Sequence, residues 1–169
     1  MTTFENLFAE YPCTLTDASV KVAVEEILAK HFDDNNNAEV WKQCLHSIDL
    51  TTLNGEDTTE KVETMAQRVN EFEENFPGVP NVAAMCVYPS LVQTVADTLT
   101  EPIGIAAVAA GFPASQTFIE VKIAEAAMAV AAGATEIDIV ISIGKFLEGN
   151  YQEVFDEISE IKAAIKDAH

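Results

Sequence analysis

The sequence predicts an α/β protein with a parallel sheet. From residue 46 onward, short stretches rich in apolar and β-branched residues alternate four times with longer stretches of helical spacing. The short stretches are mostly apolar along their whole length, as strands buried on both faces of a parallel sheet are. Four strand–helix units in succession imply right-handed crossover connections within one sheet.

A short helical segment is expected ahead of these units, over residues 1–45. Val20, Val24 and Ile27 recur at helical spacing and predict an amphipathic helix over 16–32, which Thr16 or Asp17 could cap. A run of aspartates and asparagines follows this helix and breaks it. A second short helix is expected over 38–45.

The four units are expected to fill residues 46–169. Asp57 to Glu60 has the pattern of a capping box that opens the first crossover helix, and Gly133 is a natural left-handed stop for the third. Asn150 to Glu153 repeats the capping pattern. The expected strands are 47–50, 82–87, 103–108 and 136–141, and the expected helices 57–75, 89–99, 115–132 and 150–167.

Composition excludes several classes of partner. The net charge is −19, from 28 acidic and 9 basic residues, so the basic face that nucleic acids and anionic membranes need is missing. No apolar run has the length of a membrane span, and the first residues do not have the pattern of a signal peptide. The odd number of cysteines, without C-x-x-C spacing, favours a reducing, cytoplasmic location. No metal site is expected, because the histidines lack ligand spacing.

An aspartate inside the fourth strand is the sharpest functional signal. Asp138 lies between Ile137 and Ile139, so strand alternation directs its carboxylate away from the face that these isoleucines share. Asp49 has the same setting in the first strand. Both are expected on one face of the sheet, at the carboxyl ends of the strands, where parallel α/β folds place their sites. A capping or salt-bridged structural role for Asp138 remains open.

The other ionisable residues have plainer interpretations. Cys86 is expected to be a small apolar pocket residue rather than a nucleophile, since no histidine follows another strand. Lys122 and Lys145 are expected on the solvated surface. Acidic residues of the helices, including Glu153 and Glu157, are expected on a solvated outer face.

Four stretches at successive strand ends resemble the deoxyribose-phosphate aldolases. They occur in the family's order and at suitable spacing, and the resemblance covers about residues 46–167. The stretches are Ile48-Asp-Leu-Thr-Thr-Leu-Asn54, Cys86-Val-Tyr-Pro89, Ala106-Ala-Val-Ala-Ala-Gly-Phe-Pro113 and Glu136-Ile-Asp-Ile-Val140.

This resemblance implies a partial (β/α)8 TIM barrel of about four βα units and a class I aldolase reaction. In that reaction a lysine amine forms a Schiff base, and 2-deoxyribose 5-phosphate is cleaved reversibly to acetaldehyde and glyceraldehyde 3-phosphate without a cofactor. Asp138 matches the aspartate that helps to relay a proton. Asp49, Thr51, Leu53 and Cys86 are expected to line the substrate pocket. The implied partners are a phosphosugar and small aldehydes.

The chain departs from the family where the Schiff-base lysine should be. That lysine lies on the sixth strand of the family, a second lysine lies on the seventh, and neither has a counterpart among these four units. The resemblance is therefore to the N-terminal half, and the isolated chain is expected to be inactive. Two alternatives stay open. One is a non-catalytic half-barrel that self-associates, as a homodimer. The other is a flavodoxin-like binding domain, whose strand order would reverse at a switch point.

Overall fold

The structure, a computed structural model, describes residues 3–169, which divide into two compact units between Cys44 and Leu45. The first unit contains α1 (Thr3–Glu10) and α2 (Asp17–Asn35), and α3 (Ala38–His46) runs across the division. The predicted helices 16–32 and 38–45 are confirmed, whereas α1 was not predicted. The Thr16 hydroxyl accepts a hydrogen bond from the Ser19 amide and so caps α2.

The second unit is built on a four-stranded parallel sheet in the order β1-β2-β3-β4. Each strand pairs with the next one along the chain, which is the order of consecutive barrel strands. The flavodoxin-like alternative was therefore wrong, because that fold needs a switch in strand order. The strands are β1 (Asp49–Thr51), β2 (Ala84–Val87), β3 (Gly104–Ala109) and β4 (Glu136–Ile139).

The crossover helices follow the predicted alternation, with local differences. The first is interrupted at Glu71, and the second begins as a 3-10 turn with Pro89 in its first turn, as predicted. The short α8 was not predicted. These elements are α4 (Thr59–Asn70), α5 (Phe72–Asn75), η1 (Pro89–Leu91), α6 (Val92–Thr98), α7 (Ile119–Ala131), α8 (Ile143–Leu147) and α9 (Tyr151–Ile165).

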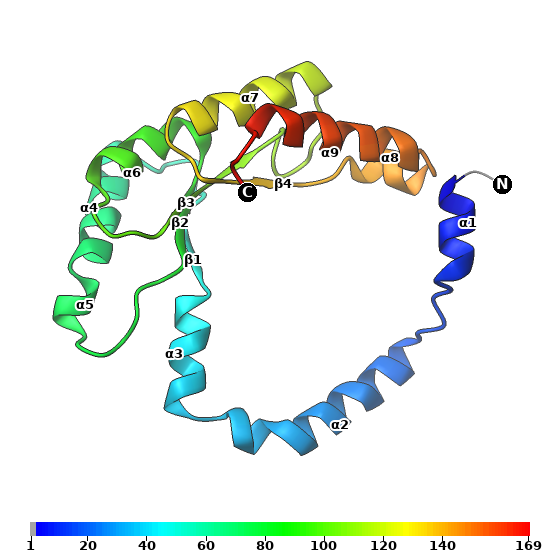
Figure 1. Cartoon of the computed structure of the whole chain (residues 1–169), viewed down its shortest axis with the longest axis horizontal. Coiled ribbons are helices and arrows are strands. Elements are labelled where there is room, and N and C mark those ends of the chain that lie inside the picture. The colour runs from blue at the N-terminus through cyan, green and yellow to red at the C-terminus, as the bar shows by residue number, and fades with distance from the viewer. Residues whose placement is uncertain (1–2) are drawn as a thin grey trace. The chain divides into compact units, whose positions relative to one another are not determined.

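The helices of the second unit pack on one side of the sheet, here called the outer face (Figure 1). Strand residues of one parity point into this layer. Met85, Val87 and Ala107 form its larger cluster with α4 and α6, and Ile137 and Ile139 contribute to a second cluster with α7 and α9. The predicted outward direction of these two isoleucines is confirmed.

The opposite, inner face is built from small side chains. Ala84, Cys86, Ala106 and Val108 form a buried cluster there, and three partly buried residues pack against it: Leu53, Tyr88 and Phe112. Within residues 45–169, no helix covers this face. It is the side that would face the axis if the sheet continued into a closed barrel.

The free edge of β4 is paired at one point. The amide of His169 donates to the carbonyl oxygen of Thr135 at 2.9 Å, and the amide of Ile137 donates to the carbonyl oxygen of His169 at 2.8 Å. This is the bond pattern of a parallel ladder. His169 thus occupies the place of a fifth strand, in line with a barrel order.

Two of the predicted caps form differently. The Thr58 hydroxyl, rather than Asp57, caps α4 by accepting from the Lys61 amide. Asn150 precedes α9 without a side-chain capping bond. Gly133 does end α7 as predicted, with a φ of 113° that a residue with a Cβ rarely adopts. A Cβ at this position would also lie 2.9 Å from that of Ala96, so both the backbone conformation and the close contact require glycine.

Candidate functional site

Strand parity brings the predicted site residues to the inner face. Thr51 is in register with Cys86, and Asp138 is in register with Val108. Cys86 and Val108 both belong to the inner-face cluster, so Thr51 and Asp138 point to the same side. Leu53 packs against this cluster from the loop that follows β1.

Cys86 is the centre of this group. It is only 3% exposed, and its thiol donates a hydrogen bond to Asp138 Oδ2 at 3.4 Å. Burial, together with the hydrogen bond and the negative charge of Asp138, raises the pKa of the Cys86 thiol to about 12. A hydrogen bond with Thr51 lowers the pKa of this thiol and the charge of Asp49 raises it, and both effects are smaller than those of burial and Asp138. The thiol is thus held protonated, which agrees with the expectation that Cys86 is not a nucleophile.

Asp49 lies lower in the sheet than predicted. It is the first residue of β1 and is in register with Ala84, the first residue of β2. Asp138 is level with Val108, the fifth residue of β3. Only Asp138 therefore lies toward the carboxyl ends. The difference arises because β1 spans three residues and begins later than expected.

A compact loop fixes the end of β1. The Asp57 carboxylate accepts hydrogen bonds from the Thr52 hydroxyl at 2.8 Å and the Asn54 amide at 2.9 Å, and it pairs with Lys61. The Lys61 ammonium is the main reason that the pKa of Asp57 lies below its usual range. This loop sets the direction in which the chain leaves β1, and with it the position of Leu53.

A second polar group lies buried on the helix side of β4. The Lys122 ammonium donates to Ser142 Oγ at 2.7 Å and to Glu157 Oε2 at 3.1 Å, and the Ser142 hydroxyl donates to the same Glu157 oxygen at 2.6 Å. We call these three residues the buried cluster. Lys122 is 1% exposed and Glu157 is 7% exposed. The predicted solvated positions of both were therefore wrong.

The buried cluster was missed because charge was given more weight than spacing. Lys122 shares a buried stripe of α7 with Ala126 and Ala129. Glu157 shares a stripe of α9 with Val154 and Ile161. A charged residue inside an apolar helical stripe is the signal that could have revealed the burial of each residue, though not their contact.

Lys145 extends this network toward solvent. Its ammonium donates to Glu153 Oε1 at 2.5 Å and to Glu157 Oε1 at 2.7 Å, and these bonds raise its pKa. Lys145 is partly exposed, as expected, but it is paired rather than free. Burial of Glu157 works to raise the pKa of that carboxyl. The bonds from Lys145, Ser142 and Lys122 outweigh burial and lower this pKa to about 2.

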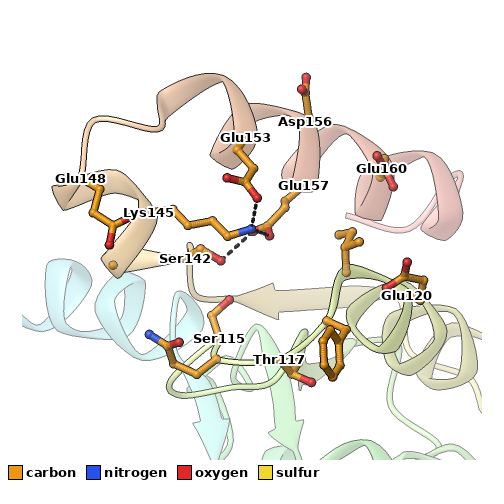
Figure 2. Close-up of a pocket in the computed structure, with 14 residues that line it drawn as sticks. Ser115, Thr117, Glu120, Ser142, Lys145, Glu148, Glu153, Asp156, Glu157 and Glu160 are labelled. Carbon is orange, nitrogen blue, oxygen red and sulfur yellow. Dashed lines mark hydrogen bonds and ion pairs between the residues drawn. The ribbon is translucent and has the colours of Figure 1, made fainter.

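Figure 2 shows the cleft into which this network opens. The cleft measures about 890 Å³ and lies among the loops after β3 and β4, α8 and α9. Its polar lining includes Ser115, Thr117 and Ser142, and most of its charged lining is acidic. The acidic residues are Glu120, Glu148, Glu153, Asp156, Glu157 and Glu160.

None of the four described strands carries a lysine or arginine. Over residues 3–169, the His, Cys, Asp and Glu side chains also form no group of three or more that could hold a metal ion. No helix in that range is both long and apolar enough to cross a membrane. The described strands therefore give the inner face carboxylates, a thiol and a hydroxyl, but no amine.

Comparison with known proteins identifies the family. The sequence model of the DeoC/LacD family aldolases matches residues 44–169. The chain belongs to the DeoC/LacD aldolase family. Residues 1–43 lie outside the matched region.

Several curated relatives carry the name deoxyribose-phosphate aldolase. This chain is 37% identical to the Homo sapiens protein over an alignment of 133 residues, which covers 72% of this chain and 42% of that protein. It is 36% identical to the Mus musculus protein over 134 residues, with the same two coverages. The chain thus spans less than half the length of these relatives.

Solved structures share the fold. This chain superimposes on the protein named QR15, an aldolase, with a TM-score of 0.65 and 26% identity, covering 73% of this chain and 52% of that one. It matches the deoxyribose phosphate aldolase of Aeropyrum pernix with a TM-score of 0.59 and 23% identity, covering 78% and 53%. The partial TIM barrel predicted from the sequence is confirmed by this likeness.

The pKa of Glu157 predicts how stability depends on pH. Glu157→Gln should lower the free energy of unfolding by about 2–4 kcal/mol at pH 7, because the buried Lys122 ammonium loses its counter-charge. A lowered folded pKa stabilises the protein above the unfolded value. The difference between wild type and variant should therefore be full above pH 4.5 and shrink as the pH falls toward 2.

Urea unfolding from pH 7 to pH 3 measures this difference. Glu160→Gln is the matched control, since Glu160 is an exposed residue of the same helix. A Glu157→Gln effect as small as that of Glu160→Gln would contradict the buried pairing.

Proposed function

We propose that this chain provides one half of the active site of a class I aldolase that cleaves 2-deoxyribose 5-phosphate to acetaldehyde and glyceraldehyde 3-phosphate. The observation that carries this proposal is the gathering of Thr51, Cys86 and Asp138 on the inner face of a partial barrel, in a member of an aldolase family. The names of the curated relatives support the choice of substrate.

Asp138 is proposed to exchange a proton with the substrate or with a water beside it. A class I aldolase joins a lysine amine to the carbonyl carbon, and the resulting iminium draws electrons from the adjacent carbon. A carboxylate can then move the proton that this carbon loses or gains. Asp138 is half-buried, and in the bonds described Cys86 donates to only one of its oxygens, which orients the carboxylate.

The remaining predicted residues are proposed to shape the pocket. The small side chains of Ala84 and Ala106 project little from the inner face, which leaves room for a small aldehyde above the strands. Thr51 is exposed and offers a hydroxyl, whereas Leu53 offers a partly buried apolar wall. Asp49 lies one inward-facing row below Thr51 and adds negative charge under the pocket.

A chain confined to these residues is proposed to be inactive, because no amine is placed to form the Schiff base. The inner face has none on its described strands. Lys122 is buried in an ion pair, and the raised pKa of Lys145 keeps that amine protonated, whereas attack on a carbonyl needs a neutral amine.

Borohydride reduction in the presence of 2-deoxyribose 5-phosphate or acetaldehyde tests this proposal. We expect no specific adduct by mass spectrometry and no release of acetaldehyde above background. Deoxyribose-phosphate aldolase that spans the whole barrel serves as the positive control. A single-site adduct on Lys145 or Lys122, together with turnover, would refute the proposed inactivity.

The predicted homodimer is a second candidate, favoured by the uncovered inner face and the largely unpaired edges of the sheet. Its geometry is constrained by charge. Glu136, like Asp49 and Asp138, has the parity of the inner face. Face-to-face closure of two copies would therefore bring carboxylates together with no lysine or arginine of the described strands to pair with them. We therefore expect association through sheet edges. Sedimentation at micromolar concentration should show a discrete dimer, and a sole species of 18.3 kDa would refute it.

A further inference from the structure

The buried lysine of α7 has no part in the proposed reaction, yet its ammonium is hydrogen-bonded to defined partners on neighbouring elements. Lys122 is 1% exposed, and its ammonium has two oxygen partners within 3.1 Å. A buried ion pair rarely adds stability beyond what apolar side chains of similar size would give. Its presence is better explained by what it fixes in place.

The buried cluster joins three separate elements. Lys122 comes from α7, Glu157 from α9, and Ser142 from the segment between β4 and α8. Ser142 is 6% exposed, and its hydroxyl both accepts from Lys122 and donates to Glu157. The end of β4 is thereby tied to the helix layer at one residue.

Few other bonds hold that end of β4. The ladder with β3 ends at Ala109 and Ile139, and on the other edge the described bonds, made by His169, reach only the start of the strand. Asp138 is the residue before the last ladder pair and precedes Ser142 by four positions. A displacement of Ser142 would therefore be transmitted directly to Asp138.

We propose that Lys122, Ser142 and Glu157 position Asp138 by anchoring the carboxyl end of β4 to α7 and α9. They are positioning residues, because they act through the strand and do not touch the inner face. The proposal rests on the proposed role of Asp138 in proton exchange. Its geometry can nevertheless be tested without substrate, through the hydrogen bond that Cys86 donates to Asp138.

The S–H stretch of Cys86 is the readout. A thiol that donates to a carboxylate absorbs at lower frequency than a free thiol, in an infrared region with few other protein bands. Replacement of Cys13 and Cys44 by serine leaves Cys86 as the sole source, and both replaced residues are exposed. Asp138→Ala provides the frequency of the thiol without its acceptor.

Ser142→Ala is the principal variant, since it detaches β4 while Lys122 and Glu157 remain paired. We expect its S–H frequency to move at least halfway from the wild-type value toward that of Asp138→Ala. Lys122→Met should move it in the same direction. Ser159→Ala is the matched control, because Ser159 is an exposed residue of α9 whose hydroxyl donates to the Phe155 carbonyl oxygen of the same helix, and it should leave the frequency unchanged.

A purely structural role for the buried cluster predicts a different result. Ser142→Ala would then lower the melting temperature but leave the S–H frequency at the wild-type value, which would overturn the proposal. The proposal is equally overturned if Asp138→Ala itself does not raise the frequency, because the contact with Cys86 would then be absent. If Lys122→Met fails to fold, Ser142→Ala decides. Neither result depends on whether the aldolase reaction is correctly assigned.

Discussion

Strand alternation is the constraint on which the rest of the structure depends. In each strand, one parity points into the helix layer and the other points away from it. Met85, Val87 and Ile137 need burial and take the outer face, which leaves Thr51, Cys86 and Asp138 no other place than the inner face. A shift of one residue in register would bury Asp138 among isoleucines. The apolar core thus selects the position of the polar site.

Charges are divided between the two sides of the sheet. On the helix side, two of the less exposed carboxylates are paired with bases, Glu157 with Lys122 and Asp57 with Lys61. On the inner face, the described strands carry no lysine or arginine that could pair with Asp49 and Asp138. Paired charges of the first kind hold loops and strand ends in position. The inner-face carboxylates are the groups to which the proposed function assigns proton exchange.

Much of this arrangement could be predicted from the sequence, because it follows from local periodicity. The four strands, the outward direction of Ile137 and Ile139, and the stop at Gly133 each depend on near neighbours along the chain. Pairings over long separations could not be predicted. Lys122 and Glu157 meet across 35 positions, and the level of Asp49 depends on the stagger between β1 and β2. The sequence thus predicts which residues share the inner face, but not their levels in the sheet.

The central claim is that Asp138 serves the inner face and not the stability of the fold. The free energy of unfolding of Asp138→Asn at pH 7 tests it most directly, with Asp57→Asn as the reference for a structural carboxylate. We expect Asp138→Asn to be as stable as wild type or more stable, since a half-buried carboxylate is removed, and Asp57→Asn to be clearly destabilised. A loss for Asp138→Asn as large as that for Asp57→Asn would contradict the account.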